Sequence, residues 1–197
     1  MKLVFATGNP GKLREAAEIL GEGFELVTPA EVGITEEIPE TGTTLRANSR
    51  QKADYIYKRT GLDCFADDSG LEVDLLGGAP GVETARYAGP GHDARANMEK
   101  LLSEMARVGG VSVGRAARSA RFRTSVTLII GGRHHFFDGV MEGHIALERA
   151  GSGGFGYDPI FIPEGYSQTN AQLGEEVKNR ISHRGKALRA MAEFLRG

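Results

Sequence analysis

The sequence predicts an α/β fold built around a mixed β-sheet. Early in the chain, short apolar runs typical of buried strands alternate with stretches whose apolar residues recur at helical spacing. Later, Ser119–Ile130 clearly alternates apolar and polar side chains, and the turn signal Gly131-Gly132 follows it. Alternating strands and helices favour parallel pairing, whereas a glycine turn favours an antiparallel hairpin, so the sheet should contain both kinds.

The elements can be taken in chain order. The first part should begin with a strand at 3–6 and a helix that has Leu13, Ala16, Ala17 and Leu20 on one face. A strand at 24–27 should follow, then a helix that Thr43 or Thr44 caps and that runs through Lys58, and then a strand at 64–66. The second part should contain a Gly/Pro-rich loop at 77–92, a helix beginning at Asp93, a loop at 108–118, the strand 119–130, strands near 134–137 and 141–148, and a last helix capped by Ser182. With no internal repeat and no linker, we expect a single domain over residues 1–197.

Composition excludes several classes of protein. The 197 residues are 40% hydrophobic and 25% charged, which is ordinary for a globular chain that buries a core. A formal net charge of -2 gives no overall basic field to hold nucleic acid. The single cysteine, Cys64, suits a reducing compartment and lies in an apolar run, where a buried thiol is expected. The sequence shows no signal-peptide core or membrane span, so we expect a cytoplasmic protein with no nucleic-acid or membrane partner.

A glycine loop follows the first predicted strand. It reads Thr7, Gly8, Asn9, Pro10, Gly11 and Lys12, and the predicted helix begins within it. Free backbone N–H groups and the positive end of a helix bind anions, and Lys12 adds a charge. The loop is not a Walker A motif, because its glycines are too close together and Leu13 follows the lysine. Its residues fit a phosphate loop and an ordinary strand-to-helix turn about equally.

Two adjacent carboxylates, Asp67 and Asp68, stand where the strand at 64–66 is expected to end, just before Ser69-Gly70. Neighbouring side chains of a strand point to opposite sides, so only one of the two should face a shared site. A carboxylate there could hold Mg²⁺ or orient a water molecule, whereas the alternative is a turn stabilised by an aspartate. The apolar run before the pair favours the functional interpretation.

The glycine-rich stretch Gly153–Pro159 surrounds Phe155 and Tyr157. Three glycines around two aromatic residues do not build a regular core element. They leave Phe155 on an open backbone, where its ring could stack on a nucleobase. An aromatic plug that packs on the core is an equally good interpretation.

Basic residues gather before and at the start of the last predicted helix. Lys178, His183 and Arg184 would present donors beside a positive helix end, which suits a phosphate or a carbonyl oxygen. In isolation, a solvated basic helix end is the more common arrangement. Glu40, in the loop before Thr41-Gly42, is by itself an ordinary loop carboxylate.

Taken together, these segments resemble the inosine triphosphate pyrophosphatase family, also called dITP/XTP pyrophosphatases or non-standard purine nucleoside triphosphate pyrophosphatases. The resemblance is specific because seven matching pieces occur in the family's order over nearly the whole chain. The pieces are Thr7–Lys12, Pro39–Thr43, Ala47-Asn48 with Lys52-Ala53, Phe65–Leu71, Gly81-Val82 with Ala85–Gly89, Gly154–Phe161, and Lys178-Asn179 with Ser182–Arg184.

The resemblance implies a two-lobed α/β fold around a long mixed β-sheet flanked by helices, with the nucleotide cleft between the lobes, and usually a homodimer. It also implies an activity that cleanses the nucleotide pool. ITP, dITP and XTP would be hydrolysed, with Mg²⁺ as cofactor, to the nucleoside monophosphate and pyrophosphate.

The resemblance further assigns roles to matching positions. Asp68 would accept a proton and bind the metal ion, Glu40 would be a second metal ligand, and Ser69 would contact the substrate. The predicted triphosphate ligands are Thr7, Gly8, Asn9, Pro10, Gly11, Lys12 and Lys52. The predicted ligands of the base and sugar are Phe155, Gly156, Tyr157, Asp158, Lys178, His183 and Arg184. Among these, Arg184 would select a 6-oxo purine, since its fixed donors match an acceptor oxygen and oppose the adenine amino group.

Two other functions remain open from the sequence. One is a Maf-like pyrophosphatase that acts on modified pyrimidine nucleotides. The other is a non-catalytic nucleotide-binding sensor, which would bind nucleotide without releasing pyrophosphate. The carboxylates Asp67, Asp68 and Glu40 favour metal-assisted chemistry over simple binding.

Overall fold

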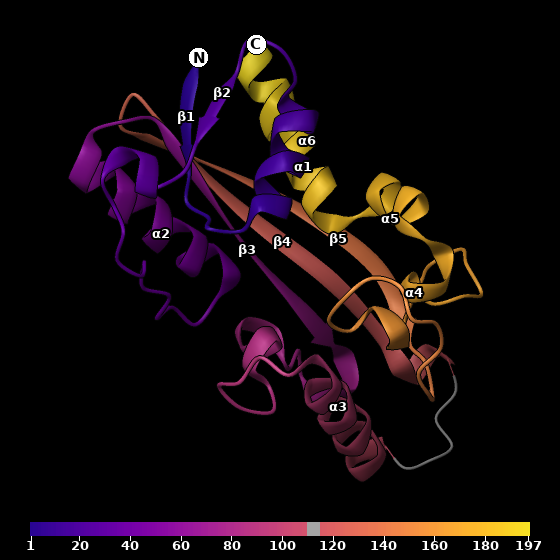
Figure 1. Ribbon diagram of the computed structural model, residues 1–197. Coiled ribbons are helices and arrows are strands. Elements are labelled where there is room, and N and C mark those ends of the chain that lie inside the picture. The colour runs from indigo at the N-terminus through magenta and orange to yellow at the C-terminus, as the bar shows by residue number, and fades with distance from the viewer. Residues whose placement is uncertain (110–114) are drawn as a thin grey trace. The chain divides into compact units, whose positions relative to one another are not determined.

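The structure is a computed structural model that describes residues 1–109 and 115–197 (Figure 1). Its strands are β1 (Lys2–Phe5), β2 (Glu25–Val27), β3 (Cys64–Val73), β4 (Ser119–Ile130), β5 (Arg133–Ile145) and β6 (Phe161–Pro163). Its α-helices are α1 (Pro10–Leu20), α2 (Leu45–Thr60), α3 (Ala94–Gly109), α4 (Asn170–Leu173), α5 (Glu175–Ile181) and α6 (His183–Arg196). Over these described residues, no helix combines the length and the apolar character needed to cross a bilayer.

The six strands form one sheet in the order β2-β1-β3-β4-β5-β6. β1 pairs in parallel with both β2 and β3, whereas β6 pairs antiparallel with β5. The two-residue connection between the neighbouring strands β4 and β5 also requires an antiparallel pair. The sheet is therefore mixed and helices flank it, as the sequence predicts.

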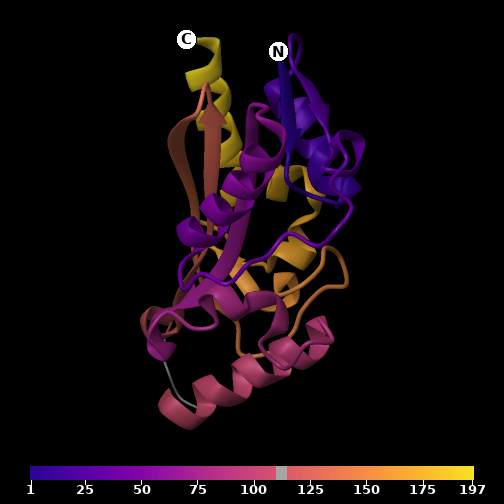
Figure 2. The ribbon, with the colours of Figure 1, turned by 90° about the vertical axis from the view of Figure 1, so that its left-hand side faces the viewer.

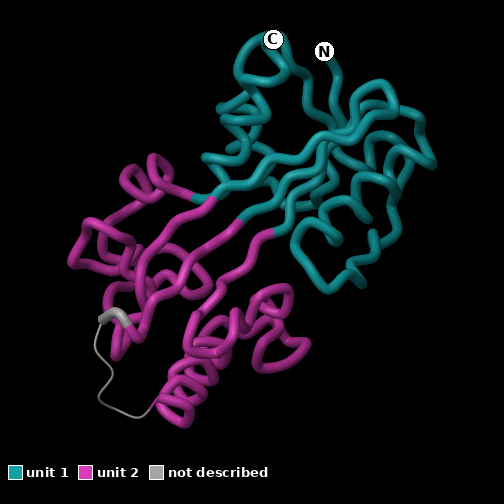
Figure 3. The backbone as a smooth tube through the Cα atoms, turned by 180° about the vertical axis from the view of Figure 1, so that it is seen from behind, with its two compact units in different colours: residues 1–68, 124–139, 183–197 teal, residues 69–123, 140–182 magenta. Residues whose placement is uncertain are grey.

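The chain divides into two compact units (Figure 3). Unit 1 comprises residues 1–68, 124–139 and 183–197, and unit 2 comprises residues 69–123 and 140–182. The strands β3, β4 and β5 contribute residues to both units. Each unit has its own buried apolar cluster, and each is described separately below. The expectation of a single domain stays a prediction.

The core of unit 1 lies on both faces of its strands. Leu3 and Phe5 of β1 belong to one buried cluster with α1 and α6, whereas Val4 belongs to another with α2. This alternation follows from the strand period of two residues. Figures 1 and 2 show α2 on one face of these strands and α6 on the other. Cys64 is fully buried, which confirms the expected buried thiol, and burial raises the pKa of this thiol to about 12.

The core of unit 2 forms around α3 and the remaining parts of the strands. Leu101 and Met105 of α3 are fully buried in one cluster with Leu71 of β3. The rings of Phe122 in β4 and Phe161 in β6 pack there with their centroids 4.6 Å apart. Unit 2 therefore has an apolar centre of its own.

The strand predicted at 64–66 is longer than expected. It continues through Asp67 and Asp68 to Val73, so the prediction that this strand ends at the two carboxylates is wrong. Leu71 and Val73 extend its apolar side and are fully buried, which makes continued pairing favourable. Phe65 is the last β3 residue in register with β1, so β3 runs on beyond the end of β1. Asp67 and Asp68 therefore stand inside a strand, next to the loop that follows β1.

The strands predicted near 134–137 and 141–148 are also corrected, because they form one strand, β5. Gly139 lies in its middle and is buried. A Cβ atom at this position would collide with the backbone of His183 and Ala187 in α6. The glycine therefore permits a close approach between strand and helix rather than a break in the strand.

The predicted helix starts are confirmed by their caps. The Asn9 side chain accepts from the backbone N–H of Gly11 at 2.8 Å at the start of α1. Thr44 caps α2 through Ala47, and Asp93 caps α3 through Ala96. The short elements β6, α4 and α5 were not predicted, because three to seven residues carry too little periodicity. The predicted loop at 108–118 includes residues 110–114, which lie outside the described residues; residues 115–118 form a short 3₁₀ helix.

We expect Gly139→Ala to destabilise the protein by about 1–3 kcal/mol or more, because the added methyl group overpacks the β5–α6 contact. Thermal unfolding of the variant measures the change. Gly91→Ala is the matched control, since a Cβ atom at Gly91 meets no atom within 4 Å. Equal melting temperatures for the two variants would contradict the close approach as the reason for glycine at 139.

Candidate active site in unit 1

The loop after β1 presents the start of α1. β1 ends at Phe5, and Pro10 occupies the first turn of the helix, where its missing N–H costs nothing. The Thr7 hydroxyl accepts from the N–H of Asn9 at 3.1 Å and shapes the loop. Gly8 is exposed, and no atom lies within 4 Å of the place where its Cβ would be. The predicted phosphate loop therefore has an open backbone beside a positive helix end.

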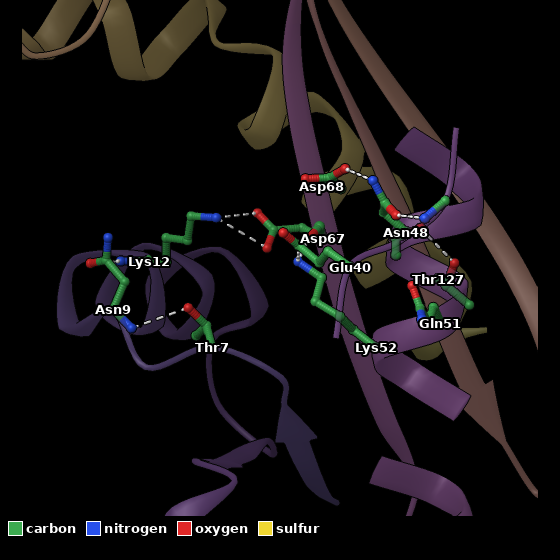
Figure 4. Close-up of polar contacts among 12 residues, drawn as sticks. Thr7, Asn9, Lys12, Glu40, Asn48, Gln51, Lys52, Asp67, Asp68 and Thr127 are labelled. Atoms are coloured by element: carbon green, nitrogen blue, oxygen red, sulfur yellow. Dashed lines mark hydrogen bonds and ion pairs between the residues drawn. The ribbon is translucent and has the colours of Figure 1, made fainter. Parts of the chain in front are cut away.

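Asp67 is a buried carboxylate surrounded by cations. Its side chain is only 1% exposed, and it accepts from Lys12 Nζ at 3.3 Å (Figure 4). It also accepts from Arg184 Nε at 3.0 Å. Arg184 Nη1 also donates to Glu15 at 3.2 Å. Burial by itself would raise the pKa of Asp67, but the charges of Lys12, Arg184 and Lys52 outweigh it and hold the pKa well below its usual range. Asp67 is therefore a permanent anion that collects the cations of unit 1.

Lys52 of α2 is the third cation near Asp67. Its Nζ donates to the backbone oxygen of Asp67 at 2.5 Å and pairs with Glu40 Oε1 at 2.5 Å. Burial would lower the pKa of Lys52, yet the carboxylates of Asp67 and Glu40 outweigh this effect and raise it. Lys52 therefore stays charged at neutral pH although its side chain is only 12% exposed.

Asp68 has the opposite electrostatic character to Asp67. Figure 4 shows the two carboxylates pointing apart, Asp67 toward Lys12 and Asp68 toward Asn48, as expected for neighbours in a strand. Asn48 Nδ2 donates to Asp68 Oδ2 at 3.2 Å. Burial raises the pKa of Asp68 to about 6, Lys52 opposes the rise, and the negative charge of Glu40 adds to it. Asp68 is thus poised to gain or lose a proton near neutral pH.

The sequence predicted no role for two residues of this site, Asn48 and Glu15, although Asn48 lies in one of the matching motifs. Asn48 precedes Lys52 by four positions, so both lie on one face of α2, and this spacing was the available signal. Glu15 follows Lys12 by three positions on α1 and contacts Arg184 rather than the lysine. The partners of both residues come from distant parts of the chain, and a local pattern does not record them.

The residues present fit a magnesium ion. Among the described residues, no three His, Cys, Asp or Glu side chains form a ready-made metal cluster. Mg²⁺ does not require one, because it usually keeps several waters and binds one or two carboxylates together with substrate phosphates. Glu40 and Asp68 supply such oxygens, and the negative charge of Glu40 adds to the cost of ionising Asp68, whose pKa is raised. A divalent cation would offset that cost.

Unit 2 holds a second group of predicted ligands. Phe155 is 73% exposed, and Lys178 Nζ lies 4.4 Å from the centre of its ring. Asp158 is buried; it pairs with Lys178 at 2.6 Å and accepts from the N–H of Phe155 at 3.1 Å. The ring of Phe155 is thus presented outward by an ordered loop, which agrees with a stacking surface rather than a plug in the core.

The remaining predicted substrate ligands are Tyr157, Gly156, Ser69 and His183. Tyr157 is buried in the core of unit 2, and its hydroxyl donates to the backbone oxygen of Thr84 at 2.7 Å. Gly156, beside it, has a φ of 60°, which favours glycine. Ser69 lies in β3, in unit 2, and His183 is the first residue of α6, in unit 1. Unit 1 thus brings together Lys12, Glu40, Lys52, Asp68 and Arg184, and unit 2 brings together Phe155, Asp158 and Lys178.

The mixed sheet, the helix start after β1 and the paired carboxylates define an α/β protein with a candidate anion-binding loop beside a candidate metal site. Comparison with known proteins gives the family. The model of the Ham1 family matches residues 3–194, and the chain belongs to this family.

Similar proteins cover nearly the whole chain. The dITP/XTP pyrophosphatase of Porphyromonas gingivalis is 51% identical over 98% of this chain and 97% of its own length. That of Bacillus subtilis is 45% identical over 98% and 96%. Among solved structures, a HAM1 protein from Coxiella burnetii has a TM-score of 0.92 at 36% identity, over 100% of this chain and 98% of that one. These similarities bear out the resemblance read from the sequence motifs.

The opposite pKa shifts of Asp67 and Asp68 predict opposite effects on the stability of the metal-free protein. Asp67→Asn leaves buried cations without their anion and should destabilise the fold by about 3–5 kcal/mol at neutral pH. Asp68→Asn removes a carboxylate whose ionisation is unfavourable in the folded state, and should stabilise it by about 1–3 kcal/mol.

The pH dependence gives the sign of each effect. The folded pKa of Asp67 is lowered, so its contribution is present at neutral pH and is lost as the solution becomes acidic. The folded pKa of Asp68 is raised from 3.8 to about 6. The increase in stability caused by Asp68→Asn should therefore be absent below pH 3.8 and complete above about pH 6. Urea unfolding of both variants across this range, with a chelator present, measures the two profiles. Changes of the same sign at neutral pH would contradict the assigned electrostatics.

Proposed function

We propose that this protein hydrolyses non-standard purine nucleoside triphosphates, such as dITP, XTP and ITP, to the nucleoside monophosphate and pyrophosphate. The relatives named dITP/XTP pyrophosphatase support this reaction. The observation that carries it is the pair of adjacent carboxylates in β3, one held as an anion by Lys12 and Arg184 and the other with a pKa near 6. Neither a pyrimidine-specific enzyme nor a passive sensor is favoured by any observation of comparable weight.

The triphosphate would bind at the loop after β1. A nucleoside triphosphate carries about four negative charges, which local cations must balance because the protein as a whole is weakly acidic. Lys12, Lys52 and the start of α1 can supply that balance. The open backbone at Gly8 lets the phosphates approach closely.

Asp68 would be the proton acceptor. In the metal-free protein its pKa is about 6, so it is mostly ionised at pH 7, yet basic enough to take a proton from a water molecule. The oxygen of that water would attack the α-phosphorus, the bond to the bridging oxygen of the β-phosphate would break, and pyrophosphate would leave. Asp67 suits this role poorly, because its surrounding cations keep its pKa low.

Glu40 and Asp68 would hold the magnesium ion. When bound, the ion would supply charge shielding for the phosphates and for the leaving pyrophosphate. Lys52, which contacts Glu40 and the backbone of Asp67, would keep the metal-binding segment next to the triphosphate loop.

The base would stack on Phe155, with Lys178 close enough to donate to a 6-oxo oxygen. Adenine carries a donor amino group at that position, so it would oppose the lysine and give it no acceptor beyond Asp158. Homodimerisation and a cytoplasmic location are further proposals that rest on the family resemblance and on the sequence composition. Light scattering that gives the monomer mass at all concentrations would contradict the dimer.

The proposed reaction is tested by following the products of ITP, XTP, ATP, GTP and dUTP with and without Mg²⁺. ITP and XTP should give monophosphate and pyrophosphate in equal amounts, only with the metal present. Asp68→Asn should lower kcat by about 10²–10⁴ because the proton acceptor is lost. IDP and orthophosphate as first products would show attack at the γ-phosphorus and overturn the mechanism.

Arg184 provides a second test. The sequence predicts that it selects the base, but its guanidinium pairs with Asp67 and Glu15. These contacts favour a different role, in which Arg184 orders the phosphate-binding cations. We therefore expect Arg184→Ala to lower kcat/KM for ITP and ATP in similar proportion, as Lys12→Ala should, since both substrates present the same phosphates. A selective loss of ITP activity would restore base selection to Arg184.

A further inference from the structure

Asn48 is a buried amide that joins two carboxylate-bearing segments of unit 1. It lies in the first turn of α2 and is 2% exposed. Its Oδ1 accepts from the backbone N–H of Gly42 at 2.7 Å, and its Nδ2 donates to Asp68 Oδ2 at 3.2 Å (Figure 4). Gly42 is two residues beyond Glu40 in the same loop. One side chain therefore touches the loop that carries Glu40 and the strand that carries Asp68.

The two partners fix which way the amide faces. A backbone N–H can only donate, so Oδ1 must face Gly42, and a carboxylate accepts, so Nδ2 must face Asp68. The flipped amide would place donor against donor and oxygen against oxygen. Asparagine meets both requirements at once, whereas an aspartate here would oppose the Asp68 carboxylate and a leucine would satisfy neither partner.

The same face of α2 holds the loop at two more points. Gln51 Oε1 accepts from the N–H of Thr41 at 2.8 Å, and Gln51 Nε2 donates to the Thr41 hydroxyl at 3.0 Å. A Cβ atom at Gly42 would lie 2.8 Å from both Ala47 Cβ and Asn48 Oδ1, so the loop is pressed against the helix and only glycine fits. The segment with Glu40 therefore has a defined place relative to Asn48.

The helix is itself fixed to the sheet. Ser49, next to Asn48, shares a buried hydrogen bond of 2.7 Å with Thr127 of β4. Ser49 also donates to the backbone oxygen of Arg46 at 3.1 Å, within the first turn of α2. These contacts add to the buried apolar packing of Ala53 and Ile56, which also holds α2 against the sheet.

We infer that Asn48 is a positioning residue that sets the distance between Glu40 and Asp68 for a divalent cation. The inference rests on the proposed function, which identifies Glu40 and Asp68 as the two metal ligands, and it adds the residue that holds them together. Asn48 does not touch the cation or the reacting atoms; it acts through Asp68 on one side and through the Glu40 loop on the other. Partners that orient metal ligands in this way typically contribute about 10–100-fold to metal affinity or activity.

The test compares Asn48→Ala and Asn48→Leu with wild type in the full chain. Leucine has the same branched skeleton, although it is bulkier, and makes neither hydrogen bond, so it serves if the alanine cavity prevents folding. Mn²⁺ binding, followed by electron paramagnetic resonance without nucleotide, should weaken by about 10–100-fold in both variants. The Mg²⁺ concentration for half-maximal pyrophosphate release should rise by a similar factor, and much of kcat should return at saturating Mg²⁺.

Ser49→Ala is the matched control. It removes a buried hydrogen bond from the neighbouring position of the same helix without touching either carboxylate, so it should lower Tm and leave Mn²⁺ affinity unchanged. Asn48 variants that bind Mn²⁺ as tightly as wild type, or an equal loss in Ser49→Ala, would overturn the inference. A wild-type protein that binds Mn²⁺ but releases no pyrophosphate would overturn the proposed function instead, and the Mn²⁺ affinities of the variants would still decide the role of Asn48.

Discussion

The ion pairs of Asp67 with Lys12 and Arg184 bring three separate elements of unit 1 to one point. Lys12 comes from α1, Arg184 from α6 and Asp67 from β3, and Lys52 of α2 reaches the backbone oxygen of the same aspartate. A buried carboxylate is costly unless cations and donors satisfy it, so its presence constrains all of these segments together. The cations that it gathers lie beside the start of α1, where a triphosphate would need them. The folding constraint and the proposed phosphate site therefore use the same charges.

Adjacent residues in β3 serve different purposes because the strand turns them to different neighbours. Asp67 faces cations and stays ionised, whereas burial and the nearby Glu40 raise the pKa of Asp68 to about 6. The protein thereby keeps one aspartate as a structural anion and leaves the other able to exchange a proton. α2 supports this division, since Lys52 donates to the backbone oxygen of Asp67 and Asn48 donates to the carboxylate of Asp68. Residues on one face of α2 therefore contact both aspartates and also the loop that carries Glu40.

Much of the candidate site could be predicted because its residues stand in local patterns. The apolar spacing of residues 10–20 predicted α1, and Asn9 and Thr44 were recognisable as helix caps or turn residues. The ends of β3 and β5 could not be predicted in the same way. Asp67, Asp68 and Gly139 are turn-like residues by composition, but pairing partners and a close helix contact keep them inside strands. Strand ends depend on what lies beside them, which a local pattern does not contain.

By itself, the sequence determined the α/β class, the glycine loop before α1, the divergence of Asp67 and Asp68, and the ordered motifs that identify the family. Each of these depends on residues close together in the chain, where periodicity and turn chemistry act directly. Only the tertiary structure decided that Asp67 pairs with Lys12 across 55 positions and with Arg184 across 117, that Asn48 bridges Gly42 and Asp68, and that Tyr157 is a core residue. The physical reason is that charge pairing and burial depend on distance in space, and the packing of strands and helices sets that distance.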